Sequence, residues 1–101
     1  MEETPIKLSV LVYREGKFFL ARCLENNLIA QALNFNELEE RVKALILAQI
    51  KRDREKGRPL FYNKTTAPKS FFALYEAASK VHVENHNDLP NNINATLALS
   101  F

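Results

Sequence analysis

The chain has 101 residues, the length of a single domain, and 47% of them are apolar while 26% are charged, which excludes the composition of a disordered protein. Fourteen Lys and Arg against twelve Asp and Glu leave a formal net charge of +2, too small to draw the whole protein onto nucleic acid or acidic lipid. The single cysteine excludes an internal disulfide framework, and the acidic start is unlike a secretory signal. No apolar run approaches the roughly twenty residues that cross a bilayer. We therefore expect a cytoplasmic protein without a membrane segment.

Three strand patterns open the chain. Residues Ile6–Tyr13 are rich in β-branched and aromatic side chains and alternate in character. After a break that contains Gly16, Phe18–Leu24 forms a second strand-like run, so the two predict a hairpin. Asn26 and Asn27 then predict a turn, and Leu28–Leu33 is a third apolar run of strand length. The first strand is expected to turn one face to the core, with Ile6, Leu8, Val10 and Val12 on it.

At Asn34 the apolar period changes from two to 3.6, which predicts a helix. The Asn34 side chain can accept from the backbone N–H of Glu37, and Glu37 can reach back to the Asn34 N–H, a capping box worth about 1 kcal/mol. Gly57 and then Pro59 predict that the helix ends near Lys56. Its apolar stripe is predicted to hold Leu38, Val42, Leu45, Ile46 and Gln49.

The second half of the chain predicts one short helix and one strand. Pro68 suits the first turn of a helix, whose apolar face is expected to carry Phe71, Leu74, Tyr75 and Ala78. Residues Ile93–Phe101 alternate apolar and polar side chains to the C-terminus, and this strand must be paired, either in the chain's own sheet or in another subunit. A homodimer or higher homo-oligomer is expected to use its apolar face, formed by Ile93, Ala95, Leu97, Leu99 and Phe101.

Together these patterns predict an α+β fold. The β-β-β-α order predicts an antiparallel sheet covered by one long helix, followed by a short helix and a C-terminal strand. Two layers are the simplest arrangement of these elements. We expect a single domain over residues 1–101, with a core over 6–58 and a C-terminal extension over 59–101.

The sequence shows no catalytic pattern, so we expect no enzymatic or hydrolytic activity, no metal and no cofactor. His82, Glu84 and His86 alternate as three potential metal ligands, but a polar solvated loop explains them better. Cys23 has no activating base near it in sequence and is expected to be a small buried side chain. With only two glycines, the chain has no glycine-rich phosphate loop.

A local basic patch is the alternative functional feature. It would bind nucleic acid through the basic end of the long helix, assisted by Tyr62, Lys64 and Lys69. Its position at the helix C-terminus already accounts for basic residues, because they favour the helix dipole. The patch consists of Lys51, Arg52, Arg54, Lys56 and Arg58. The aromatic side chains Phe71, Phe72 and Tyr75 could stack on bases, although helical spacing favours a core role.

Two short segments resemble a known family. Phe19–Leu24 followed by Leu28–Ala32, with a capping residue at Asn34 and Glu37 three residues later, is similar to the HicB-type antitoxin domain. The resemblance covers about residues 6–58. The later segments Gly57–Phe61, Ala67–Pro68 and Phe71–Ala78 are also similar to a group of small stand-alone HicB-like proteins.

The resemblance implies a partial RNase H-like fold without the nuclease carboxylates. It also implies oligomerisation and a protein-binding function, in antitoxins the neutralisation of a small mRNA-cleaving toxin of the HicA type. Ala32 stands where the family commonly has glycine, and Leu38 where a small alanine is typical, so packing between helix and sheet is expected to differ. Residues 59–101 match neither DNA-binding module found in such antitoxins, which argues against autoregulatory DNA binding.

Overall fold

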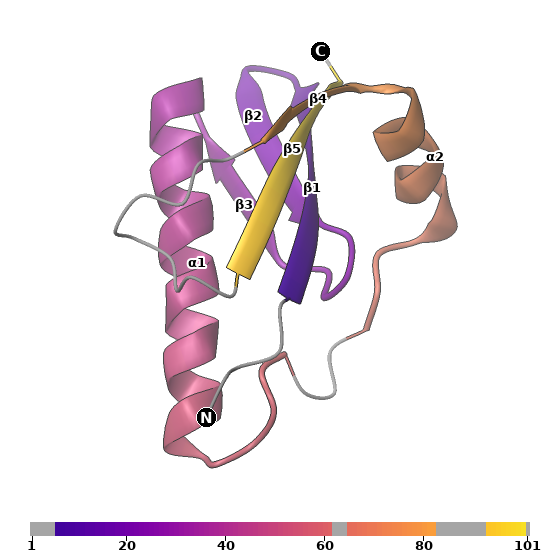
Figure 1. The fold of residues 1–101 in the computed structure, drawn as a ribbon. Helices are drawn as coiled ribbons and strands as arrows, with labels where there is room; N and C mark the ends of the chain where they lie inside the picture. Colours follow the sequence, from indigo (N-terminus) through magenta and orange to yellow (C-terminus); the bar gives the residue numbers. More distant parts are fainter. Residues whose placement is uncertain (1–5, 62–64, 83–92, 101) are drawn as a thin grey trace.

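One five-stranded sheet forms the centre of the computed structural model, with strand order β3-β2-β1-β5-β4. Helix α1 lies on one side of this sheet and helix α2 on the other (Figure 1). The structure describes residues 6–61, 65–82 and 93–100. Its elements are β1 (Ile6–Glu15), β2 (Phe18–Cys23), β3 (Ile29–Ala32), α1 (Phe35–Glu55), α2 (Lys69–Ala77), β4 (Ser79–His82) and β5 (Ile93–Ser100).

The first three strands form the antiparallel meander that the sequence predicts. β1 pairs with β2, and β2 pairs with β3, both antiparallel. The turn between β1 and β2 places Gly16 at φ 62°, a left-handed conformation that costs glycine nothing. Asn27 adopts φ 57° in the next turn, where asparagine tolerates this region and its neighbour Asn26 accepts a hydrogen bond from the Leu28 N–H.

The C-terminal strand makes the sheet mixed rather than wholly antiparallel. β5 lies between β1 and β4, parallel to β1 and antiparallel to β4. The alternating pattern of this strand fits pairing either in the chain's own sheet or in another subunit, and in the structure it lies in the chain's own sheet. Strand β4 lies in a stretch for which no strand was predicted. Paired on both edges, β5 has no free backbone row of its own.

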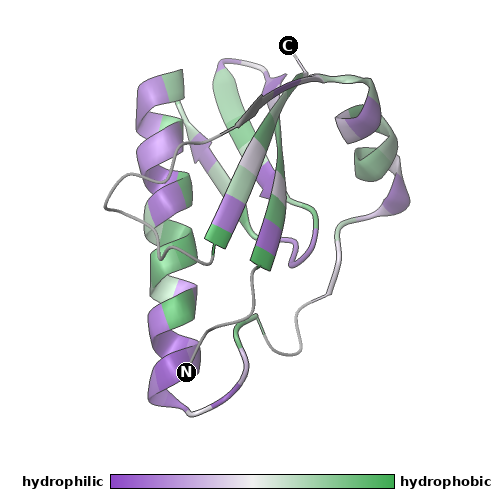
Figure 2. Ribbon diagram, in the orientation of Figure 1, coloured by the Kyte–Doolittle hydropathy of each residue, from purple (hydrophilic) through white to green (hydrophobic). Residues whose placement is uncertain are grey.

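Helix α1 begins and ends as the sequence predicts. The Asn34 Oδ1 accepts the Glu37 N–H at 2.8 Å, while the expected return contact from Glu37 goes to the Asn34 side-chain amide, at 3.4 Å, instead of the backbone. The helix stops at Glu55, and Gly57 follows at φ 64°. Hydrophobic and hydrophilic stretches alternate along it (Figure 2). It covers the face of the sheet that carries the larger core, whose buried members include Leu8, Val10, Leu38, Ile46 and Leu97.

A second core on the opposite face makes the fold three-layered, which corrects the predicted two layers. Leu11 is 0% exposed and packs there with Leu24, Ala98 and Tyr75 of α2. The two-layer prediction was wrong because β1 is apolar on both faces, as expected of a strand at the centre of a covered sheet. Leu74, predicted on the inner face of α2, is instead 46% exposed.

Candidate protein-binding surface

Helix α2 covers only half of its side of the sheet. It packs against β1 and β5 and leaves β2 and β3 without a helix on this side. The strand register puts Leu20 beside Tyr13, and Ile29 beside Arg22, on this same side. Ile29 remains 45% exposed and Leu20 is only partly buried. We call this half of the sheet the open face and define it by Phe18, Leu20, Ile29 and Gln31.

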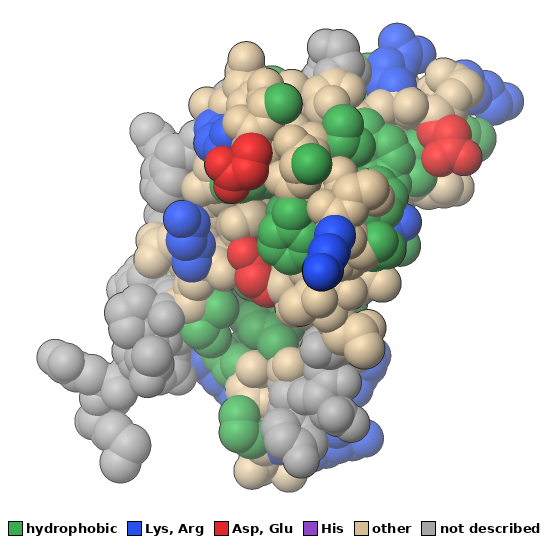
Figure 3. Space-filling view, turned by 90° about the vertical axis from the view of Figure 1, so that its right-hand side faces the viewer, with side chains coloured by type: hydrophobic (Ala, Val, Ile, Leu, Met, Phe, Trp, Pro, Cys, Tyr) green, Lys and Arg blue, Asp and Glu red, His purple; other side chains and the backbone are tan. Residues whose placement is uncertain are grey.

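The open face is more apolar than a solvated sheet face. Three of its four side chains are hydrophobic, Arg22 is the charged residue beside them on the same side of β2, and Leu33, directly after β3, is 58% exposed. Figure 3 views the molecule from the side of α2 and shows hydrophobic side chains on this side of the molecule, α2 included, with single charged groups among them. Exposed apolar groups of this kind, next to one another and rimmed by polar residues, mark surfaces that bind other proteins.

The Arg22 side chain lies between the open face and α2. The Arg22 guanidinium carbon lies 4.2 Å from the centre of the Phe71 ring, and its Nη1 donates to Asn27 Oδ1 at 2.6 Å. The Phe71 ring in turn lies 5.8 Å from that of Tyr13. This partly buried stack fixes α2 on the sheet, so Phe71 packs against the second core and does not form a base-stacking platform. Tyr75 is buried, whereas Phe72 is 39% exposed.

The outer edge of β3 continues the open face. The Cys23 N–H donates to the Leu28 carbonyl at 2.8 Å, which sets the alternation of hydrogen bonds between β2 and β3. In this alternation the backbone groups of Ala30 and Ala32 point toward β2, and those of Ile29 and Gln31 point away from the sheet. No described strand lies beyond β3 in the sheet order, so this outward row is a free edge.

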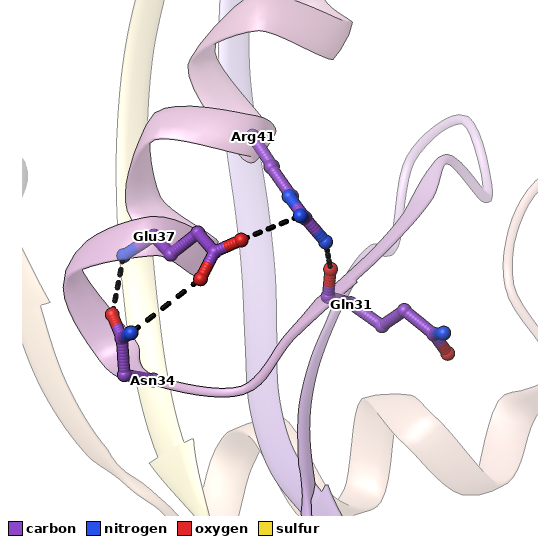
Figure 4. Close-up of polar contacts among 4 residues, drawn as sticks. All are labelled: Gln31, Asn34, Glu37 and Arg41. Atoms are coloured by element: carbon purple, nitrogen blue, oxygen red, sulfur yellow. Dashed lines mark hydrogen bonds and ion pairs between the residues drawn. The ribbon is translucent and has the colours of Figure 1, made fainter.

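One outward carbonyl of this edge is held by helix α1. The Arg41 Nη1 donates to the Gln31 carbonyl at 2.6 Å, while Nη2 of the same guanidinium bonds to Glu37. Glu37 in turn contacts the cap residue Asn34. Figure 4 shows this chain of contacts running from the first turns of α1 to the edge strand. Arg41 therefore ties the helix N-terminal half to β3 and leaves the outward Gln31 N–H open.

The residues of β5 that were predicted to form an interface pack in the core of their own chain. Ile93, Ala95 and Leu97 are 1–5% exposed in the larger core, and Leu99 packs against it; Phe101 lies outside the described residues. The four described side chains lie on the face of the sheet that carries the larger core, where Ile93, Ala95 and Leu97 are buried within the subunit. This packing leaves little of their apolar surface accessible to a second copy.

The predicted basic patch is only partly brought together. Lys51, Arg52, Arg54 and Lys56 are exposed at the end of α1, and Arg54 makes a further interaction. Arg58 points back instead, its Nε 2.6 Å from Asp53 Oδ1, and is thereby removed from any phosphate-binding set. Lys69 is exposed at the start of α2. The other two assisting residues, Tyr62 and Lys64, lie outside the described residues.

The residues considered for chemistry do not form a described site. Cys23 is buried at 3% exposure, as predicted. Burial, reinforced by the Glu25 carboxylate 3.8 Å from the sulfur, raises the pKa of its thiol to about 12, the opposite of an activated nucleophile. His82 ends β4, and Glu84 and His86 lie outside the described residues. Among the described side chains no group of three His, Cys, Asp or Glu could hold a metal ion.

An open groove along α1 is not lined by an arrangement of residues suited to catalysis either. Its volume is about 580 Å³, and it is lined by Asn36, Glu39, Glu40, Lys43, Ala44 and Leu47. Its charges are balanced in part by the contact of Lys43 with Glu39 at 3.8 Å. In the described part of the chain, no helix is both long enough and apolar enough to cross a bilayer.

No functional role was predicted from the sequence for Ile29, Gln31, Leu33 or Arg41. The signal in the sequence was the run Ile29–Leu33, which contains no charged residue. An uncharged run of this kind is common in an inner strand and unusual in an edge strand. The sequence did not indicate whether this strand lies inside the sheet or at its edge. Comparison with known proteins adds no assignment: no protein-family model, curated protein or solved structure matches this chain.

Proposed function

We propose that this protein is a non-catalytic, cytoplasmic protein-binding module that engages its partner through the open face. The observation that carries the proposal is the unequal cover of the sheet: α2 packs on β1 and β5, while Ile29 remains 45% exposed beside it. If this side of the sheet served stability alone, both of its halves would be covered by other elements or would carry polar side chains. The reason is that exposed apolar area costs about 25 cal/mol per Å² relative to burial.

The HicB resemblance supports a protein as the ligand. The antiparallel β1–β2–β3 meander followed by the capped helix α1 occupies the residues on which that resemblance rests. The resemblance names a small toxin of the HicA type as the partner, and such a partner could add contacts to a sheet edge and its adjoining apolar face. A short neighbouring reading frame that encodes such a toxin would identify the candidate directly.

The test compares partner capture by matched surface variants in the native host. The binding variant combines Ile29→Lys with Leu20→Lys on the open face, and the control combines Phe72→Lys with Leu74→Lys on α2. We expect wild type and control to retain the same co-purifying protein, and the binding variant to lose it by at least about tenfold, equivalent to about 1.4 kcal/mol. Because Leu20 is partly buried, circular dichroism must first show both variants folded. Equal capture by all three proteins would refute the open face as the binding surface.

Nucleic-acid binding is the competing function, favoured by the exposed Lys51, Arg52 and Lys56 at one helix end. It predicts binding to RNA or DNA that weakens steeply as salt rises. Lys51→Glu combined with Arg52→Glu would abolish such binding, whereas the open-face variant would leave it unchanged. Under the protein-binding proposal, neither pair changes any affinity for nucleic acid, since none is expected.

A further inference from the structure

We infer that the free edge of β3 pairs with β3 of a second copy of this chain, antiparallel and around a two-fold axis at Gln31. The sheet would then run continuously through both subunits, and their open faces would join into one binding platform. The inference rests on the proposed function because it names what adjoins the open face. The edge and the face share Ile29 and Gln31, so mass in solution and partner capture are both measured on each variant to distinguish them.

The composition of the two sheet edges singles out β3. Edge strands are normally protected from pairing by charged residues, proline or a covering element. The opposite edge, β4, carries Lys80, whose Nζ lies 3.2 Å from the carbonyls of Glu76 and Ala78. Strand β3 itself has no charged residue and no proline, and its charged contact comes from Arg41 of α1, at the Gln31 carbonyl. Apolar Ile29 is exposed at its start and Leu33 directly after its end. Such an edge is suited to pairing and would be an aggregation hazard without it.

The backbone permits this register and the side chains select it. Outward backbone groups belong to Ile29 and Gln31, so antiparallel pairing must match odd-numbered residues with odd-numbered residues. An axis at Gln31 pairs this residue with itself and sets Ile29 opposite Leu33 of the second copy. An axis one residue earlier sets Ile29 opposite the polar Gln31 instead. Apolar cross-strand pairs each contribute about 0.2–1 kcal/mol, which favours the register centred on Gln31.

The charged side chains beside the edge are paired within their own chain. Glu37 and Arg41 are partners one helical turn apart, and Arg41 contacts the Gln31 carbonyl at the proposed axis. A two-fold rotation there brings the Arg41 of each copy near the axis, and each guanidinium keeps Glu37 of its own chain as its partner. The Gln31 carbonyl can accept two hydrogen bonds. It can therefore keep Arg41 while accepting the N–H of the second Gln31.

Mass in solution provides the first test. The wild-type chain of 11.6 kDa should show twice that mass in light scattering, and Ile29→Lys combined with Leu33→Lys should show the monomer mass. The matched control is Phe72→Lys combined with Leu74→Lys, whose wild-type side chains are exposed to a similar degree; it should remain a dimer. A monomeric wild type, or a dimer that survives the β3 substitutions, overturns the inference.

Disulfide trapping tests the register in the full chain. Gln31→Cys should form an intersubunit disulfide under mild oxidation, because directly opposite residues in a hydrogen-bonded pair have Cα atoms about 5.5 Å apart. Ile29→Cys should not form such a disulfide, since residue 29 of the second copy lies four residue pairs away along the proposed β3–β3 ladder. The native Cys23 is buried and serves as the background. Trapping of Ile29→Cys as efficiently as Gln31→Cys overturns the register. A monomeric wild type that still captures its partner would refute this inference and leave the proposed function standing.

Discussion

The Nε of Arg58 lies 2.6 Å from Oδ1 of Asp53, a carboxylate that is completely buried although the arginine side chain is 31% exposed. The second oxygen of Asp53 accepts the Phe61 N–H at 2.7 Å, and Gln49 donates to the first at 3.1 Å. Phe61 adopts φ 59°, a left-handed conformation that costs a residue with a side chain about 1–3 kcal/mol. Asp53 thus fixes the path of the chain as it leaves α1.

Replacing this carboxylate should destabilise the fold strongly. Asp53→Asn keeps the size of the side chain but sets an amide N–H₂ group among buried donors, so we expect a loss of about 2–4 kcal/mol in the free energy of unfolding. The matched control is Glu55→Gln, an exposed acid two residues later, with an expected change within about 0.5 kcal/mol. Urea unfolding followed by circular dichroism measures both. Equal stability of the two variants would contradict a structural role for Asp53.

The Asp53 carboxylate should also make the free energy of unfolding depend on pH. Burial by itself raises the pKa of Asp53, but the hydrogen bonds from Arg58, Phe61 and Gln49 outweigh it and hold the pKa below its usual value. A carboxyl whose pKa is lowered by folding stabilises the native state above the unfolded-state pKa of about 3.9, and this contribution is lost as pH falls further through the native pKa. The stability gap between wild type and Asp53→Asn should therefore be constant near neutral pH and shrink below about pH 4. A gap that is independent of pH down to the native pKa would show that Asp53 is not ionised in the fold.

The second core should be as necessary as the first. Leu11 is 0% exposed under α2, so Leu11→Ala should cost about 2–5 kcal/mol through lost burial and a residual cavity. Leu74→Ala, on the exposed side of the same helix, should change stability by less than about 0.5 kcal/mol. Thermal and urea unfolding of both variants provide the measurement. A similar small effect for both would mean that α2 does not pack on the sheet in solution.

The thiol of Cys23 should be inert in the folded protein. Its pKa of about 12, raised from 9.0 by burial and the nearby Glu25, reduces the thiolate fraction at pH 8 by about a thousandfold. Reaction with Ellman's reagent should be slow, and should become complete once urea unfolds the chain. Ser70→Cys, at an exposed position of α2, supplies the reactive control. Rapid modification of Cys23 in the native protein would show that the strand opens or that the thiol is activated.

Local interactions explain why parts of the fold were predictable from the sequence. The start of α1 depends on Asn34 and Glu37, three residues apart, and its end depends on Gly57. The β1–β2 hairpin depends on the break around Gly16 and on the apolar runs on either side. Turns and caps are formed by neighbours in sequence, so their residue types and spacing are sufficient to predict them.

Residues far apart in sequence determine the candidate surface, and the sequence could not place them. Arg58 looked like a member of the basic patch until Asp53 proved to be buried beside it. Leu11 and Tyr75 are 64 residues apart and meet only because α2 returns to the second face of the sheet. Ile29 looked like an ordinary strand residue because nothing local indicates that its strand is an edge.

The sequence by itself determined the α+β class, the three-stranded meander, the capped helix and the burial of Cys23, because periodicity and capping act over a few residues. Only the tertiary structure decided that β5 enters the sheet parallel to β1, that α2 forms a third layer, and that β3 is left as an edge beside an open apolar face. These outcomes depend on which distant strands and helices compete for the same apolar surface, and that competition is resolved only when the whole chain packs.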